Sequence, residues 1–495
     1  MKKHILYIVK GFAFTALVLA ALAAINAMSV PKYLNSDFPT STNFLGFYEM
    51  EENTVDVLFL GSSHTMSAFS PQELYDRFGI RSYNLGSQEQ NLLLSYYWLR
   101  EALRFQRPQV VVLDTYLCFE FMADEPLNSS EVTIRRALDH MRWSGVKWEA
   151  VCDICARDQA QSVSSYIFPN IRYHDRWLSD LKEADFTPWD WPAFYQLKGY
   201  ALVTDYPSTA DYQPFQADSS GETTPMLPVM EEYLGKIADL CREEGIRLLL
   251  VKTPTTAADA GKYNAVAAFA QVRGLDYYDF NEASLYEQLD YDFASDNREW
   301  SHVNHWGAVK LCGYLGGILT EDCGVAPVQD RQWEDSRPFY EDMVENAELQ
   351  RTTDLTAYLE ALRRERYTVF LAAKDDASAS LTPAMLRGLA DLGLETDLAG
   401  RLHSSFYAVV SPEGVREELG EQALAASGSF RGGLSVYSVS SAGFHCGNAC
   451  SIVIDGQEYA KNRRGLNIVV YDSSCKKVVD SVCFDTFDAG CGASR

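Results

Sequence analysis

The sequence predicts a doubly wound α/β domain with a parallel sheet, followed by a smaller β-rich α/β domain. Three runs carry this prediction, because nearly continuous apolar residues are typical of buried parallel strands: 55–60, 108–114 and 246–252. Helical patterns separate the runs, and such alternation indicates an α/β sheet. A chain of 495 residues is too long for one ordinary core, so we expect two folded domains.

The first domain is predicted to cover residues 54–325. Its first strand ends in the small-residue turn Gly61-Ser62-Ser63, and a second strand is expected at 81–85, ending at Gly86. The later elements follow in chain order: a helix at 92–105, strand 108–114, a helix at 228–244, strand 246–252 and a helix at 307–319. The stretch 120–227 interrupts this alternation and is rich in aromatic residues. It is predicted to be a helical insertion that either caps the sheet edge or adds ordinary core aromatics.

Composition bounds the possible partners. The chain has 43 basic and 68 acidic side chains, a formal net charge of −25. Such a surface repels phosphates, so we expect no nucleic-acid partner. Apolar residues make up 47% of the chain, which is enough for large cores and argues against general disorder.

The first 30 residues are predicted to be a transmembrane anchor. An apolar run, strongest at 11–30, follows a basic start at Lys2 and Lys3, and about 20 apolar residues span a bilayer as a helix. The positive-inside bias places the N-terminus in the cytoplasm and the bulk of the chain outside the cell membrane. A cleaved signal peptide is the alternative, because residues 21–23 have cleavage spacing. Residues 31–53 are predicted to form a polar stalk.

The eleven cysteines leave the disulfide pattern open. An extracytoplasmic location permits disulfides, and the odd count leaves at least one thiol unpaired or bonded to another chain. Cys152 and Cys155 have C-x-x-C spacing, but no second such pair accompanies them. We therefore expect two thiols on one helix here, and no metal site.

Ser63 is the candidate nucleophile. A serine between a strand and a helix is held at the C-terminal edge of the sheet, where backbone N–H groups, including that of Ser63, can form an oxyanion hole. Gly86 ends the next strand and is a second candidate donor. A serine hydroxyl is a weak nucleophile without a base, and His302 is the candidate base. Glu299, three residues earlier, can orient the imidazole, and Asp296 competes for that role.

Other polar residues near these motifs are weaker candidates for substrate binding: His64, His174, Arg176, Lys252 and Asn304. His64 follows the nucleophile, and its more ordinary role is packing or capping the helix start. His174 and Arg176 lie in the aromatic insertion and could contact an anionic or sugar substrate. Lys252 ends a strand and can line the pocket.

Residues 54–325 resemble the SGNH (GDSL-like) hydrolases. Gly61-Ser62-Ser63 resembles their first sequence block, Gly86 their second, and Glu299-x-x-His302 their last. The resemblance is closest to membrane-anchored bacterial proteins of this type that modify cell-surface polymers, including the D-alanyl transfer proteins of teichoic acid and the alginate O-acetylation proteins.

The resemblance implies a three-layer αβα fold, a Ser-His-acid triad and ester chemistry, without a metal or organic cofactor. The implied partners are a cell-surface glycan or acylated polymer and a membrane acyltransferase. The chain departs from the family pattern at three places. Ser62 replaces the aspartate of the first block, the acid is Glu299 instead of aspartate, and the oxyanion asparagine has no match, with Thr115 near its position.

A linker at 326–349 is predicted to lead to the second domain, residues 350–490. Its expected elements are helices at 354–364 and 383–392 and strands at 367–373, 405–411, 451–455 and 466–472, an α/β mix rich in β. Motifs in 369–378, 464–470 and 484–487 resemble the interleukin-like EMT inducer (PANDER-like) domain, which implies glycan binding. The pair Asp375-Asp376 is either a general acid and base or, more ordinarily, a turn or backbone cap.

These patterns lead to one expected function and one alternative. The expected function is an anchored, extracytoplasmic serine esterase or O-acyltransferase that acts on a cell-surface polysaccharide. Water accepts the acyl group in an esterase and a sugar hydroxyl accepts it in a transferase, with the same triad. The alternative is a non-catalytic glycan-binding or envelope-assembly protein with a degenerate SGNH domain.

Overall fold

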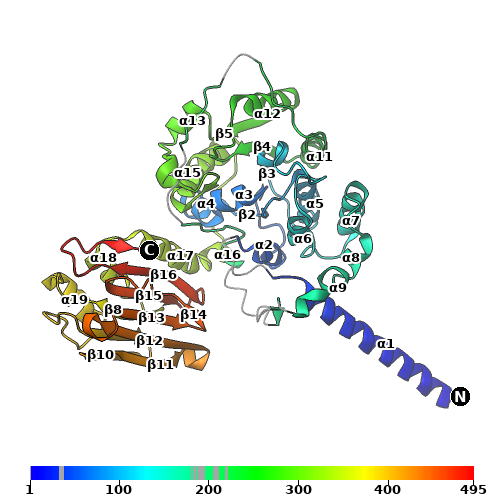
Figure 1. The fold of residues 1–495 in the computed structure, drawn as a ribbon. Coiled ribbons are helices and arrows are strands. Elements are labelled where there is room, and N and C mark those ends of the chain that lie inside the picture. The colour runs from blue at the N-terminus through cyan, green and yellow to red at the C-terminus, as the bar shows by residue number, and fades with distance from the viewer. Residues whose placement is uncertain are drawn as a thin grey trace. The chain divides into compact units, whose positions relative to one another are not determined.

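The computed structural model divides into two compact units, Met1–Tyr340 (unit 1) and Glu341–Arg495 (unit 2). The α/β class is confirmed, because unit 1 holds a five-stranded parallel sheet and unit 2 a ten-stranded, mainly antiparallel sheet (Figure 1). The residues that the structure describes are 2–32, 38–178, 180–181, 185–186, 195–204, 211–217 and 221–495.

The parallel sheet of unit 1 has the strand order β2-β1-β3-β4-β5. Its strands are β1 (Val57–Leu60), β2 (Ser82–Asn84), β3 (Val110–Asp114), β4 (Arg247–Lys252) and β5 (Asp276–Asp279). β1 pairs with β2 on one side and β3 on the other. Nearly every residue of β1, β3 and β4 is buried, which explains why their apolar runs were visible in the sequence.

The helices expected at 92–105, 228–244 and 307–319 are present as α5 (Leu92–Ala102), α11 (Pro228–Glu244) and α15 (His305–Glu321). In addition, α3 (Ser63–Ala68) and α4 (Pro71–Phe78) follow β1, and α12 (Ala260–Arg273), which was not predicted, follows β4. α5 packs against α11, and α4 packs against α15 (Figure 1). Side-chain caps fix where several begin. Asn91, for example, accepts the Leu94 N–H at 2.9 Å at the start of α5.

The short elements that precede α15 complete the sheet edge. They are η1 (Tyr116–Cys118), α13 (Ala283–Gln288), α14 (Phe293–Asp296), β6 (Asn297–Arg298) and β7 (His302–Val303). β6 and β7 form a small antiparallel hairpin in which Arg298 pairs with His302. The turn of this hairpin is held from outside, because the Trp300 carbonyl accepts the Thr256 N–H at 3.0 Å.

The predicted stalk at 31–53 is wrong for its central part. Thr40–Phe47 forms helix α2, and Phe44 and Phe47 are buried in the core of unit 1. Phe44 stacks on Trp98 with ring centroids 4.1 Å apart. The helix was missed because its first residues are polar, although the helix contributes to the core.

Between residues 131 and 178 the insertion is mainly helical, whereas its described residues 201–204, 211–217 and 221–227 are not. Its elements are α6 (Glu131–Leu138), α7 (Gly145–Arg157), α8 (Val163–Ile167), α9 (Asn170–Tyr173) and η2 (His174–Leu178). α7 packs on α5, and apolar side chains of α6 and α7 join the core of unit 1. Three of the aromatic residues expected in the insertion, Trp189, Trp191 and Phe194, lie outside the described residues.

Within the described part of the chain, one helix is long and apolar enough to cross a membrane: the Tyr7–Ser29 portion of α1 (Lys2–Ser29). All eleven cysteines are free thiols. Cys152 and Cys155 lie one turn apart on α7. The boundary between the two units, after Tyr340, falls inside the linker predicted at 326–349, which holds α16 (Arg331–Glu334) and most of α17 (Arg337–Arg351).

Unit 2 confirms the strands and helices expected there. These are α18 (Leu355–Ala361), β8 (Tyr367–Asp375), α19 (Pro383–Asp391), β9 (Ser405–Ser411), β13 (Ala449–Ile454) and β15 (Gly465–Asp472). Six further strands were missed: β10 (Gly414–Gly420), β11 (Leu424–Phe430), β12 (Ser435–Gly443), β14 (Gln457–Glu458), β16 (Lys477–Phe484) and β17 (Ala493–Ser494). β8 lies in the middle of the sheet and pairs with β9, β12 and β15.

Candidate active site

Gly61 lets β1 turn sharply into α3. Its φ is +150°, and a Cβ there would clash with the Thr65 hydroxyl and lie 2.7 Å from Asp114 Cβ. Ser62 then caps α3 by accepting the His64 N–H at 3.3 Å. Ser63 is therefore the first residue of α3, at the C-terminal edge of the parallel sheet.

Ser62 also ties this turn to the end of β3. Its hydroxyl donates to Asp114 Oδ2 at 3.2 Å, and the Tyr116 N–H donates to Asp114 Oδ1 at 3.3 Å. Burial raises the pKa of Asp114 to about 7, although the charge of Lys252 and these hydrogen bonds oppose the shift. The backbone beside Ser63 is thus fixed by a buried polar contact.

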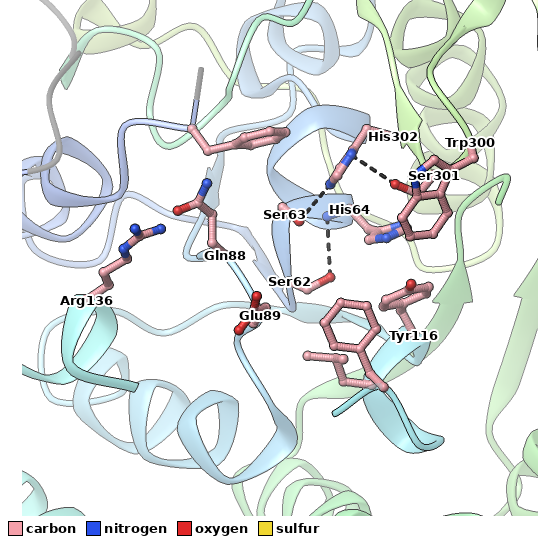
Figure 2. A pocket seen from close by; sticks show the side chains of 13 residues that line it. Ser62, Ser63, His64, Gln88, Glu89, Tyr116, Arg136, Trp300, Ser301 and His302 are labelled. Atoms are coloured by element: carbon pink, nitrogen blue, oxygen red, sulfur yellow. Dashed lines mark hydrogen bonds between the residues drawn. The ribbon is translucent and has the colours of Figure 1, made fainter. Parts of the chain in front are cut away.

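His302 approaches Ser63 from the β6–β7 hairpin, more than two hundred residues along the chain. Ser63 Oγ and His302 Nε2 are 2.8 Å apart, and Figure 2 shows the two side chains in contact. On the other side of the ring, His302 Nδ1 is 2.7 Å from Glu299 Oε1. A carboxylate oxygen accepts, so Nδ1 carries the proton and Nε2 is free to accept from the Ser63 hydroxyl.

The hairpin turn decides which acid meets the histidine. Glu299 has a φ of +52°, which turns the chain back so that its carboxylate faces His302. Asp296 is buried and contacts Lys310 Nζ at 2.7 Å and the Asp292 N–H at 2.8 Å. Of the two acids that the sequence left open, Glu299 contacts His302.

The charge state of His302 suits a base. Burial lowers its pKa from the ordinary value of 6.5, and the hydrogen bond and charge of Glu299 oppose this shift. The imidazole is therefore neutral at neutral pH. Ser301 Oγ also lies 3.0 Å from His302 Nδ1 and helps to hold the ring.

A cavity of about 220 Å³ opens beside Ser63 and His302. Apolar and aromatic side chains form one part of its wall: Phe38, Tyr116, Leu117, Phe121 and Trp300. Polar side chains form another part: Gln88, Glu89 and Arg136 (Figure 2). Phe121 and Trp300 are 42% and 47% exposed, so the cavity is open to molecules from solvent.

His64 also lines the cavity, and its ring is held by packing. Its Nδ1 lies 3.2 Å from Thr253 Oγ1, and it stacks on Tyr116 with ring centroids 3.8 Å apart. Burial, and then the nearby His302 and Lys252, hold its pKa well below the ordinary value. A neutral, buried imidazole here shapes the pocket.

Two of the three groups expected from the sequence to hold the oxyanion have partners within the protein. The Gly86 N–H donates to Asn84 Oδ1 at 3.1 Å, and the Thr115 hydroxyl donates to the Val251 carbonyl at 3.1 Å. Neither group therefore points a free donor at the cavity in this structure. The Ser63 N–H belongs to the first turn of α3, where helix N–H groups lack an intrahelical acceptor.

Gln88 is a pocket residue that the sequence analysis missed. Its side-chain Oε1 is buried and has no hydrogen-bond partner, although buried polar atoms are normally paired. In the view of Figure 2 its carboxamide extends into the pocket between Ser63 and Arg136. The signal that could have found it is its place two residues after Gly86, at the same sheet edge as Ser63.

Four residues expected at the substrate lie elsewhere. Asn304 caps α15, since it accepts the Trp306 N–H at 3.0 Å and the Gly307 N–H at 3.2 Å. Lys252 is buried beside the rings of Phe119 and Tyr116 and does not line the cavity.

His174 and Arg176 do not line the cavity either. His174 is exposed on η2, and its Nδ1 lies 3.2 Å from the Ile171 carbonyl. Arg176 donates to the Ser29 carbonyl at 2.8 Å, at the end of α1. In this structure both residues contact other parts of the protein.

The acidic turn of unit 2, Asp375 and Asp376, follows a different pattern. Asp376 is fully buried and accepts the Ser378 N–H at 2.7 Å and the His403 N–H at 2.8 Å. It therefore caps backbone, which is the more ordinary of the two roles that the sequence allowed.

No three His, Cys, Asp or Glu side chains are arranged to hold a metal ion in the described parts of either unit. The groups in contact beside the cavity are the hydroxyl of Ser63, the imidazole of His302 and the carboxylate of Glu299. No known protein-family model matches the chain, and no curated protein matches it.

Proposed function

We propose that this chain is a membrane-anchored, extracytoplasmic serine esterase or O-acyltransferase that acts on a cell-surface polysaccharide. One observation carries the proposal: a continuous relay from Ser63 Oγ through His302 to Glu299, with contacts of 2.8 and 2.7 Å beside a cavity. Such a relay activates a serine for acyl transfer.

In the proposed reaction Ser63 Oγ attacks the acyl carbonyl carbon while His302 Nε2 takes the hydroxyl proton. The carbonyl electron pair moves to oxygen, and Glu299 stabilises the imidazolium that forms. The intermediate then collapses, and His302 returns the proton to the departing alcohol oxygen. Water or a sugar hydroxyl attacks the acyl-serine ester in a second cycle of the same kind, which releases Ser63.

The oxyanion of the intermediate needs donors, and we assign this role to the Ser63 N–H and the carboxamide of Gln88. A carboxamide holds an acceptor oxygen and a donor NH₂ group at its two ends, so a half-turn about the last side-chain bond exchanges them. The unpartnered Gln88 Oε1 supports this assignment, because the half-turn breaks no existing hydrogen bond of that atom.

The cavity wall supports an acylated sugar as substrate. Aromatic faces such as those of Phe121 and Trp300 suit the apolar face of a sugar ring or an acyl group, and Arg136 and Glu89 offer hydrogen bonds to hydroxyls. The resemblance to SGNH hydrolases, with its three-layer fold, points to the same substrate class.

The anchor and unit 2 complete the proposal. The apolar span Tyr7–Ser29 would hold the N-terminus in the cytoplasm and the cavity outside. Unit 2, by its resemblance to the interleukin-like EMT inducer domain, would bind the polysaccharide chain. The partners would be this polymer and a membrane acyltransferase that supplies acyl groups.

One observation favours the alternative, a non-catalytic glycan-binding protein. The Gly86 N–H, expected to hold an oxyanion, donates to Asn84. If no other group donates to the oxyanion in its place, the chain would keep the Ser63–His302–Glu299 relay but would not transfer acyl groups efficiently.

A fluorophosphonate probe separates the two functions, because it modifies only an activated serine. The full-length chain in detergent should become labelled, and Ser63→Ala should abolish the labelling. Ser429→Ala, at an exposed serine of β11, is the matched control and should label like wild type. Absence of wild-type labelling, or equal labelling of Ser63→Ala, would reject the catalytic function.

A further inference from the structure

Several large apolar side chains of α8, α9, η2 and the segment that follows are exposed, and α9 contacts both α8 and η2. We call this set the interface patch: Ile167, Phe168, Ile171, Trp177, Leu178 and Phe186. Their exposed fractions range from 38% for Ile167 to 85% for Leu178. Single exposed apolar residues are ordinary, but a cluster of this size marks a surface that is covered in use.

Helix α9, which carries Ile171 of the interface patch, lies beside the C-terminal end of α1 (Figure 1). The Asn170 N–H donates to Asn26 Oδ1 at 3.3 Å, and Ser29 Oγ donates to Asn170 Oδ1 at 3.1 Å. Arg176 donates to the Ser29 carbonyl at 2.8 Å. The patch is thus attached to the end of the apolar helix by side-chain hydrogen bonds from both segments.

These hydrogen bonds fix where along the length of α1 the interface patch lies, and so how deep in a bilayer it would sit. The apolar span of 23 residues, Tyr7–Ser29, ends at Ser29. At about 1.5 Å per residue it is roughly 34 Å long, against about 30 Å for the hydrocarbon core of a bilayer. Groups bonded to Ser29 therefore stand at the boundary between hydrocarbon and headgroups.

Arg176 suits this level, because the last carbonyls of a helix have no partner within it. Its guanidinium donates to the Ser29 carbonyl and also pairs with Asp185 Oδ2 at 2.7 Å. The cation is thereby neutralised and the helix end is satisfied where water is scarce.

We propose that the interface patch docks into the headgroup region of the same bilayer that α1 crosses, so that unit 1 contacts the membrane at a second place. The proposal rests on the anchoring part of the proposed function. The occupant is lipid because the patch is continuous with the lipid-facing helix, and its Trp, Phe, Leu and Ile side chains are those that enter membrane interfaces.

The docked patch would set the position of the cavity. Arg172 of α9 bonds Glu131 of α6 at 3.1 Å, and α6 carries Arg136 of the cavity wall. A rigid path of helices therefore runs from the bilayer surface to the pocket. The cavity would face substrates that lie close to the membrane.

Photo-crosslinking tests the docking in the full-length chain, purified in phosphatidylcholine–phosphatidylglycerol nanodiscs. A benzophenone-bearing phenylalanine replaces Leu178, and mass spectrometry counts lipid adducts. Val272 on α12 is the matched control, because its exposed fraction of 88% is close to the 85% of Leu178. Leu17 on α1, 70% exposed, reports the anchor itself.

We expect lipid adducts at positions 17 and 178 and severalfold fewer at 272. Adducts at 17 but not at 178, or equal yields at 178 and 272, would overturn the docking and leave the anchor intact. A protein–protein adduct at 178 in place of lipid would also overturn it. Absence of adducts at both 17 and 178 would reject the anchor as well.

Discussion

The candidate active site of unit 1 and the acidic turn of unit 2 contain similar groups in different relations. Each brings a carboxylate to a histidine. His302 Nδ1 lies 2.7 Å from Glu299, whereas His403 Nδ1 lies 3.6 Å from Asp376 and 3.7 Å from Asp375. The residue types alone, a histidine beside a carboxylate, would not separate these two regions.

The difference lies in what the remaining atoms touch. Asp376 accepts backbone N–H groups and is fully buried, so its oxygens are occupied by structure. Glu299 has an exposed side chain whose contact is the histidine, and the far nitrogen of His302 reaches a serine hydroxyl in a cavity. A carboxylate–histidine pair becomes chemically useful when the histidine has a reactive group on its other side.

The largest expected effect is that of His302→Ala. Without a base the Ser63 hydroxyl stays protonated, so fluorophosphonate labelling should slow on the order of 10⁴-fold. His403→Ala, the matched change in unit 2, should label at the wild-type rate. The labelling rate constant, measured from gel fluorescence against time, checks both. Equal slowing by the two changes would contradict the distinction between the regions.

The next effect is that of Gln88→Met, which keeps the side-chain length and removes the carboxamide. If Gln88 holds the oxyanion, labelling should slow by about 10²-fold, as for loss of one oxyanion donor. Gln88→Glu should be slower still, because a carboxylate repels the developing negative charge. Gln271→Met, at an exposed glutamine of α12, is the control and should change nothing. Wild-type rates for both Gln88 variants would remove this residue from the oxyanion hole.

A smaller effect is expected for Glu299→Gln. The Glu299 side chain is 46% exposed and water screens its charge, so labelling should slow by only about 10-fold, against about 10⁴-fold for a buried triad acid. The pH profile gives a second readout. Labelling needs neutral His302, so the rate rises as pH passes upward through the His302 pKa, which lies below 6.5.

Glu299 raises the His302 pKa, so Glu299→Gln should move the midpoint of this profile to lower pH. Asp296→Asn is the control, because Asp296 contacts Lys310 and not His302. It should leave the midpoint in place. A midpoint that moves with Asp296→Asn and not with Glu299→Gln would reverse the assignment of the acid.

Much of unit 1 could be predicted because buried parallel strands carry uninterrupted apolar runs. β1, β3 and β4 are of this kind. α2 was missed because its buried first turn, Thr40–Asn43, is polar and draws its burial from tertiary packing. β10 and β11 were missed for a related reason: their glycine, serine and glutamate residues form half-exposed strands whose pattern arises from pairing.

The site was predictable to the level of residue types. Ser63, His302 and an acid could be named from their places after a strand and before a helix. The choice between Glu299 and Asp296 could not be made, because it depends on the positive φ of Glu299 in a two-strand hairpin. The position of Gln88, two residues after Gly86, could have placed it at this sheet edge, but its unpaired buried oxygen is a property of packing that the sequence does not carry.

The smallest expected effect on chemistry is that of Asp376→Ala, which should leave the labelling rate unchanged, because every residue that lines the cavity belongs to unit 1. Stability should respond instead. Without the Asp376 carboxylate, the buried N–H groups of Ser378 and His403 lose their acceptor. The free energy of unfolding of unit 2 should therefore fall by about 1–3 kcal/mol. Denaturant unfolding measures this, with Asp375→Ala, partly exposed, as the milder control. If Asp376→Ala slowed labelling without loss of stability, the acidic turn would share in the chemistry, and the contrast between the two regions would fail.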